Sequence, residues 1–193
     1  MSDVIKIAFV GGPSSGKTTL FDALGKEHSK SQDIAFIDEV ARQFFSENII
    51  APEDRSKAEV QARIQDQILS KEQQALEANL KIIICDRSVI DPVVYAESRK
   101  LNKLSDELLE RIKFWIPTYT TIYLFYINDV VHAKDDIRYE DSALRQKIHQ
   151  AYLDFFARNN IKYELLSGTL NERIAKVNLA INAHGLKSPD NML

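Results

Sequence analysis

The 193-residue sequence predicts an α/β fold, in which a parallel sheet of five strands is covered by helices on both faces. Short, mostly apolar runs alternate along the chain with longer amphipathic segments, as expected for strands joined by helical crossovers. The first apolar run, 5–10, is interrupted only by Lys6 and leads straight into a glycine-rich loop. Near-continuous apolar runs of this length are typical of strands that are buried on both faces of a parallel sheet.

The expected elements follow one another regularly. Strands are predicted at 5–10, 34–37, 81–85, 121–127 and 163–166. Helices are predicted at 17–28, 40–48, 52–79, 91–100 and 170–183, the last followed by a cap at Gly185. Two more helices are predicted, one that begins with a cap at Ser105 and ends at 115, and one that contains Arg145 and ends at 158. Pro52 favours a helix start because proline fits the first helical turn. The segment 187–193 has no periodicity, so we expect a single domain over 1–186 and a loose C-terminal tail.

The loop after the first strand carries the most specific motif. Residues 11–18 fit G-x-x-x-x-G-K-[ST] between a strand and a helix, which is the setting that a phosphate-binding loop requires. The expected nucleotide-binding residues are Gly11, Gly12, Pro13, Ser14, Ser15, Gly16, Lys17, Thr18 and Thr19. Glycines let the backbone approach the phosphates, Lys17 reaches the β- and γ-phosphates, and Thr18 is a ligand for Mg²⁺. The motif predicts a P-loop domain that binds ATP, with GTP left open, together with Mg²⁺.

Charged residues follow the second and third predicted strands. Asp38 and Glu39 come after 34–37, and Asp86 and Arg87 come after 81–85. Ligands of open α/β sheets bind at the carboxyl ends of the strands, so these side chains are expected beside the phosphate loop.

Each of these residues has a candidate role in phosphoryl transfer, which needs a metal, a group that orients the acceptor and cations around the transferred phosphate. Asp86 is expected to coordinate Mg²⁺ and to take the acceptor's proton, with Glu39 as the rival base. Arg87, Arg42, Asp38 and Glu39 are expected to hold the acceptor. The structural alternatives are a helix-capping acid for Asp86 and a surface salt bridge for Arg87.

A strongly charged segment, 128–141, follows the fourth predicted strand. We expect it to be a lid whose Arg138, with Arg145 on the next helix, closes on the β- and γ-phosphates and stabilises the transition state. On charge pattern alone, a solvated loop and an ordinary helix surface are the favoured explanation of these residues.

The amino-acid composition indicates which classes of partner the protein can have. The net charge of −3 gives no basic field for a nucleic-acid duplex, so a small molecule is favoured. The single cysteine, Cys85, lies within an apolar run and is expected to be a buried thiol, and the four histidines show no metal-binding spacing. Neither a leader pattern nor an apolar run of membrane-spanning length occurs, so we expect a cytoplasmic protein. The oligomeric state is not indicated.

Several segments together resemble the nucleoside and nucleoside-monophosphate kinases of the P-loop group. They are 11–19, 38–42, 86–88 with Asp91-Pro92 and Tyr95, and 136–138 with Arg145. Within that group the chain is similar to nicotinamide riboside kinase domains and to related small AAA-like ATPase domains. The resemblance implies the strand order 2-3-1-4-5, a mobile lid, and 167–169 beside the nucleotide base.

The resemblance also implies a reaction: ATP- and Mg²⁺-dependent transfer to a small nucleoside-like acceptor, with ribosylnicotinamide as the leading candidate. The lid has fewer arginines than nucleotide kinases usually show, which disfavours a monophosphate acceptor. The alternative function is a regulatory module that binds and slowly hydrolyses a nucleoside triphosphate and acts through a protein partner.

Overall fold

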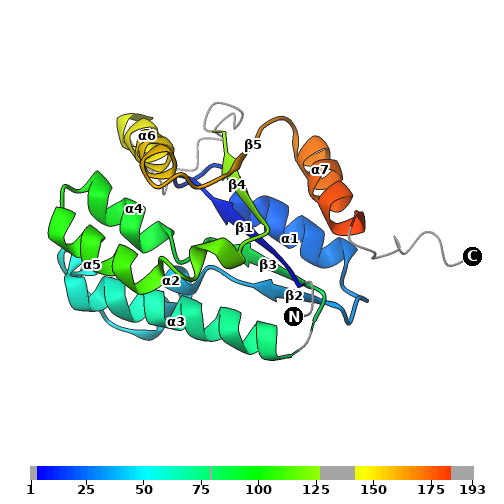
Figure 1. The fold of residues 1–193 in the computed structure, drawn as a ribbon, viewed down its shortest axis with the longest axis horizontal. Coiled ribbons are helices and arrows are strands. Elements are labelled where there is room, and N and C mark those ends of the chain that lie inside the picture. The colour runs from blue at the N-terminus through cyan, green and yellow to red at the C-terminus, as the bar shows by residue number, and fades with distance from the viewer. Residues whose placement is uncertain (1–3, 79, 127–141, 184–193) are drawn as a thin grey trace, which may run out of the picture.

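The computed structural model describes residues 4–78, 80–126 and 142–183. Its centre is a five-stranded parallel sheet in the order β2-β3-β1-β4-β5 (Figure 1). The strands are β1 (Ile5–Val10), β2 (Ile34–Ile37), β3 (Ile82–Asp86), β4 (Thr121–Phe125) and β5 (Glu164–Leu166). The fold class and the strand order are both as predicted.

Helices cover both faces of the sheet. They are α1 (Lys17–Glu27), α2 (Val40–Glu47), α3 (Ala58–Glu77), α4 (Asp91–Ser98), α5 (Asn102–Ile112), α6 (Ser142–Arg158) and α7 (Leu170–Asn182), with 3-10 helices η1 (Pro52–Ser56) and η2 (Ile116–Thr118). Helices α1 and α7 pack on one face, and α2 to α6 pack on the other (Figure 1). Among the described residues no helix is both long and apolar enough to cross a membrane.

Strand β1 shows why a central parallel strand is apolar throughout. All six of its residues are buried. Ile7 and Phe9 pack with α1 and α7, whereas Ala8 and Val10 pack with the helices of the opposite face. Successive strand residues point to opposite faces, and here both faces are covered.

The charged interruption of β1 has a partner in the core. The ammonium group of Lys6 donates a hydrogen bond of 2.6 Å to Glu72 Oε2 on α3. Trp115 Nε1 and the Tyr119 hydroxyl donate to the same carboxylate, each at 2.6 Å. A buried charge is tolerated when it is paired and hydrogen-bonded, as both members of this pair are.

The predicted helix 52–79 is wrong in its first turns, because the segment forms η1 and then α3. Lys57 separates the two with extended backbone angles, φ −62° and ψ 144°. Pro52 does start a helix, but a 3-10 helix that ends before α3 begins at Ala58.

The predicted cap at Ser105 is also wrong. Helix α5 already begins at Asn102, and the buried Ser105 hydroxyl donates to Glu97 Oε1 at 3.0 Å, which joins α5 to α4. A true cap was missed at Thr169, which forms a capping box with Glu172 at the start of α7.

Helix α5 ends at Ile112, three residues before the predicted end at 115, and the remaining helix and strand boundaries that the structure describes agree with the predictions to within two residues. The segment 128–141 with Arg138, the cap at Gly185, the tail 187–193 and the domain boundary at 186 lie outside the described residues, so these assignments stay predictions.

Candidate nucleotide and acceptor site

The phosphate-binding loop joins β1 to α1 and needs its glycines for two reasons. Gly11 and Gly16 have φ values of 139° and 88°, which side chains of other residues rarely allow. A Cβ atom at Gly11 would also lie 3.4 Å from Phe125 Cβ on β4. The backbone is therefore shaped as the motif predicted, and it opens directly into α1, whose N-terminal N–H groups favour an anion.

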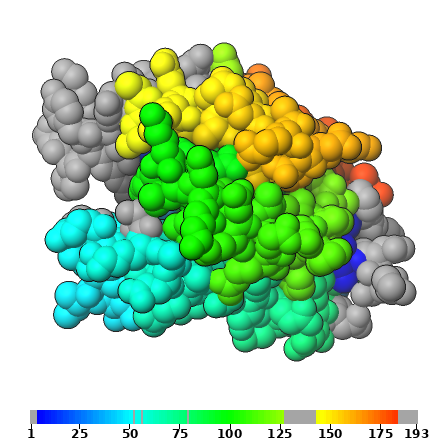
Figure 2. All heavy atoms as spheres, turned by 60° about the vertical axis from the view of Figure 1, so that its left-hand side comes forward, coloured from blue at the N-terminus to red at the C-terminus, as the bar shows by residue number. Residues whose placement is uncertain are grey.

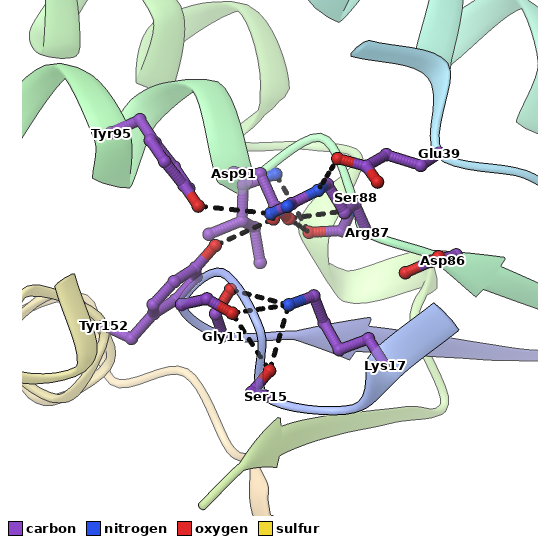
Figure 3. Close-up of polar contacts among 12 residues, drawn as sticks. Gly11, Ser15, Lys17, Glu39, Asp86, Arg87, Ser88, Asp91, Tyr95 and Tyr152 are labelled. Atoms are coloured by element: carbon purple, nitrogen blue, oxygen red, sulfur yellow. Dashed lines mark hydrogen bonds and ion pairs between the residues drawn. The ribbon is translucent and has the colours of Figure 1, made fainter. Parts of the chain in front are cut away.

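Lys17 points back into this loop (Figure 3). Its ammonium group donates to the Gly11 carbonyl at 3.1 Å, to the Gly12 carbonyl at 2.7 Å and to Ser15 Oγ at 3.0 Å. The residue is only 5% exposed. Burial, together with the charge of Arg87, lowers the pKa of Lys17 to about 7. The loop thus holds one cation where the phosphates of a nucleotide are expected.

Asp86 comes to the loop through the pairing of the strands. In the register of β1 with β3, Asp86 lies opposite Phe9, two residues before Gly11. Asp86 Oδ2 accepts a hydrogen bond of 2.7 Å from the Thr18 hydroxyl. Its Oδ1 is buried with no hydrogen-bond partner among the described residues, and burial raises the pKa of the carboxyl group.

This pair fits a magnesium ion. A hydroxyl and a carboxylate oxygen are ligands that Mg²⁺ accepts, and Asp86 Oδ1 leaves one carboxylate oxygen available. Thr18 and Asp86 are therefore the residues that would hold the metal, and this assignment stays a prediction.

Arg87 is the centre of the second half of the site. Its Nε donates to Glu39 Oε1 at 2.6 Å, and its Nη1 donates to Asp91 Oδ1 at 3.1 Å and to the Tyr95 hydroxyl at 3.3 Å (Figure 3). Arg42 Nη2 lies 2.8 Å from the other oxygen of Glu39. Burial alone would raise the pKa of Glu39, but the charge and hydrogen bond of Arg87, with Arg42, lower it. Glu39 is thus a charged anchor for two arginines.

Asp91 fixes this cluster to the rest of the fold. Its Oδ2 accepts from the Ser88 N–H at 2.9 Å and from Ser88 Oγ at 3.0 Å. Its Oδ1 accepts from the Tyr152 hydroxyl of α6 at 2.8 Å. We call Glu39, Arg87, Asp91, Tyr95 and Tyr152 the Arg87 network. The backbone of Arg87 has a φ of 84°, a conformation that residues other than glycine rarely adopt, and the network holds Arg87 in this conformation.

Two further arginines contact the phosphate loop from outside. Arg145 on α6 is buried, and its Nη2 donates to the Ser14 carbonyl at 3.4 Å. Arg173 on α7 is buried as well, and its Nη1 donates to the Ser15 carbonyl at 3.0 Å. Arg145 thus contacts the loop backbone, and its closure on the phosphates stays a prediction. No role at the loop was predicted for Arg173.

One cavity of about 750 Å³ connects the loop with the Arg87 network. Of the predicted site residues it is lined by Pro13, Ser14, Ser15, Gly16, Lys17, Thr18, Thr19, Asp38, Glu39, Arg42, Asp86 and Arg87. The cavity therefore brings together three strand ends that are distant in sequence. Gly11, Gly12 and Arg145 support the loop without lining the cavity, and Arg138 lies outside the described residues.

Sequence reasoning did not assign roles in the site to Asp91, Tyr95 or Tyr152. Arg87, Asp91 and Tyr95 follow one another at intervals of four, and that spacing across a strand end and the next helix was a usable signal. Tyr152 had no such signal, because its bond to Asp91 spans 61 residues.

Cys85 and His28, two residues for which the sequence predicted no role in the site, are both buried. Cys85 is a buried free thiol whose pKa is raised by burial. His28 Nε2 lies 2.8 Å from Asn178 Oδ1, in a contact between α1 and α7. In the described ranges no group of three or more His, Cys, Asp or Glu side chains could hold a metal.

Comparison with known proteins identifies the family of this chain. A family model described as an AAA domain matches residues 6–173. No curated protein matches the chain.

Solved structures share the fold. NadR in complex with NR aligns with a TM-score of 0.71 and 20% identity over 96% of this chain and 51% of that chain. Thymidylate kinase from Ehrlichia chaffeensis aligns with a TM-score of 0.64 and 16% identity over 93% and 99% of the two chains. Deoxyadenosine kinase from M. mycoides, with products dCMP and a flexible dCDP bound, aligns with a TM-score of 0.61 and 14% identity over 93% and 100%. The chain thus spans about half the length of NadR and almost the whole length of the two kinases.

Proposed function

We propose that this chain, which belongs to the AAA domain family, transfers the γ-phosphoryl group of ATP to a hydroxyl group of a small nucleoside-like acceptor. The observation that carries the proposal is the single cavity lined by both the phosphate loop and the Arg87 network. A protein that only binds a nucleotide needs the first part and not the second. Three proteins with this fold support it, because one is in complex with NR and two are named as kinases.

The residues divide into two groups by chemistry. Lys17 and the loop N–H groups hold the β- and γ-phosphates, and the Lys17 ammonium neutralises charge on the transferred group. Mg²⁺, held by Thr18 and Asp86, would supply a further positive charge at the phosphates. Because Lys17 and Asp86 are buried, their charges act more strongly than in bulk water.

The Arg87 network positions the acceptor. Arg87 is held by Glu39 and Asp91, so it can present its remaining N–H groups in a fixed direction, and Glu39 can accept a hydrogen bond from an acceptor hydroxyl. Asp86 is the base that we favour over Glu39. Arginines pair with both oxygens of Glu39 and lower its pKa, whereas Asp86 Oδ1 has no hydrogen-bond partner among the described residues.

A screen of nucleosides for acceptor-dependent ADP release tests the proposal, with ribosylnicotinamide as the first acceptor. We expect at least one nucleoside to raise ADP release well above the rate with ATP alone. The alternative, a regulatory module, predicts ATP hydrolysis that no acceptor changes, together with nucleotide-dependent affinity for a protein partner.

A further inference from the structure

Arginines that the proposed reaction does not use line the outer part of the cavity. Lys17 and Asp86 are buried, 5% and 3% exposed, whereas Arg55 and Arg99 line the same cavity with exposed side chains. The difference in burial separates an inner end, where the phosphates react, from an outer rim.

The two rim arginines come from different elements and lie on aromatic rings that also line the cavity. The guanidinium carbon of Arg55, on η1, lies 4.7 Å from the centroid of the Phe45 ring on α2. The guanidinium carbon of Arg99, directly after α4, lies 5.8 Å from the centroid of the Tyr95 ring. Figure 2 shows the segment with α2 and η1, in cyan, below the green α4 and α5 on this side of the molecule. A guanidinium group stacked on a ring keeps its N–H edge free to bind.

Neighbouring carboxylates do not neutralise these two arginines. In the described part of the chain neither Arg55 nor Arg99 forms an ion pair. Of the acids nearest in sequence, Asp54 pairs with Lys57 at 2.8 Å and Glu97 pairs with Arg158. Glu53 is exposed and does not line the cavity.

The deeper acids are engaged as well. Glu39 and Asp91 together balance the charges of Arg87 and Arg42. Asp38 lines the cavity with an exposed carboxylate, so the two guanidinium groups of the rim face one opposing charge. The rim therefore keeps a net positive charge.

We propose that the acceptor carries an anionic group, a phosphate or a carboxylate, away from its reacting hydroxyl, and that Arg55 and Arg99 bind this group. The inference rests on the proposed function and specifies its substrate class. Guanidinium groups bind both anions with two parallel hydrogen bonds. Ribosylnicotinamide has a cationic ring, so it is expected to bind less tightly than an anionic nucleoside.

Calorimetry on the full chain saturated with Mg²⁺ and AMP-PNP tests the inference with three ligands. Uridine is uncharged, orotidine adds a carboxylate, and uridine 3′-monophosphate adds a phosphate; all three keep a free 5′-hydroxyl. We expect at least one anionic ligand to bind about tenfold more tightly than uridine or better, and the ligand that does so identifies the anion. Ribosylnicotinamide, titrated in parallel, is expected to bind less tightly than that ligand.

Substitutions connect the preference to the rim. Arg55→Gln and Arg99→Gln should each remove most of the preference for the anionic ligand and leave the affinity for AMP-PNP unchanged. Arg63→Gln is the matched control, because Arg63 is also exposed and also lies on a ring, that of Phe44, but does not line the cavity. It removes the same charge from the protein and should change nothing.

The inference is wrong if no anionic ligand binds more tightly than uridine, or if Arg63→Gln has the same effect as the rim variants. Its failure can be separated from that of the proposed function. Phosphoryl transfer with equal KM for uridine and the anionic nucleosides would refute the anion site alone. Preferential anion binding without any phosphoryl transfer would refute the kinase and retain the site.

Discussion

The Thr18 hydroxyl donates a 2.7 Å hydrogen bond to Asp86, which joins the first turn of α1 to the end of β3. These residues are 68 positions apart in sequence and meet because β1 and β3 are adjacent and parallel. The contact leaves the second oxygen of the Asp86 carboxylate without a hydrogen-bond partner among the described residues, in a buried position beside the phosphate loop.

Asp86→Asn should separate chemistry from binding. The amide keeps the shape but loses the negative charge and the proton-accepting oxygen. We therefore expect kcat to fall by about 100-fold or more, with ATP affinity within a few-fold of the original. Steady-state kinetics and equilibrium binding of a nucleotide analogue measure the two effects. Asp22→Asn, on the exposed side of α1, is the control. Equal losses in kcat and affinity would remove Asp86 from the proposed role.

Nucleotide affinity should depend on pH through Lys17. The free protein holds Lys17 at a pKa of about 7, and bound phosphates raise that pKa because they favour the ammonium form. Above pH 7, binding must therefore take up a proton, and affinity should fall by up to about tenfold per pH unit. Calorimetry in buffers with different ionisation enthalpies measures this uptake directly. In Lys17→Arg the cation does not titrate, so an unchanged pH dependence in that variant would exclude Lys17 as the source.

Tyr152→Phe should weaken the acceptor site and not the nucleotide site. The variant removes one hydrogen bond to Asp91, worth about 1 kcal/mol, while keeping the ring in the core. We expect KM for the acceptor to rise several-fold and the dissociation constant for the nucleotide to stay constant. Tyr163→Phe is a suitable control, since Tyr163 stacks on Phe156 and is partly exposed. An equal rise for both substrates would indicate a general loss of structure.

Much of the fold could be predicted because it depends on local patterns. Buried strands such as β1 are apolar throughout, and the phosphate loop is a contiguous motif. Asp86, Glu39 and Arg87 could be predicted because residues after parallel strands share one edge of the sheet.

The rest depends on contacts that local sequence does not encode. Tyr152 reaches Asp91 from 61 residues away, and Arg173 reaches Ser15 from 158 residues away. The break at Lys57 was missed because Pro52, with Glu53 and Asp54 beside it, already has the composition of a helix start. That break matters for function, since it places Arg55 on a separate short helix that lines the cavity.

Glu72→Gln should destabilise the fold strongly. The amide would leave the buried Lys6 ammonium without its counter-charge, and breaking one side of a buried ion pair costs about 3 to 5 kcal/mol. Denaturant unfolding measures the loss, with Glu77→Gln on the exposed end of α3 as the control. If Lys6→Met combined with Glu72→Leu is as unstable as Glu72→Gln alone, the uncompensated charge is not the cause.

Identifying the product that carries the γ-phosphate shows most directly whether this cavity carries out phosphoryl transfer. Phosphorus NMR of ATP turnover with a saturating nucleoside acceptor distinguishes a phosphorylated acceptor from inorganic phosphate. We expect most of the γ-phosphate to appear on the acceptor, and Asp86→Asn to suppress this product. Inorganic phosphate as the only product with every acceptor, at a rate that no acceptor changes, would show that the protein is not a kinase for these acceptors.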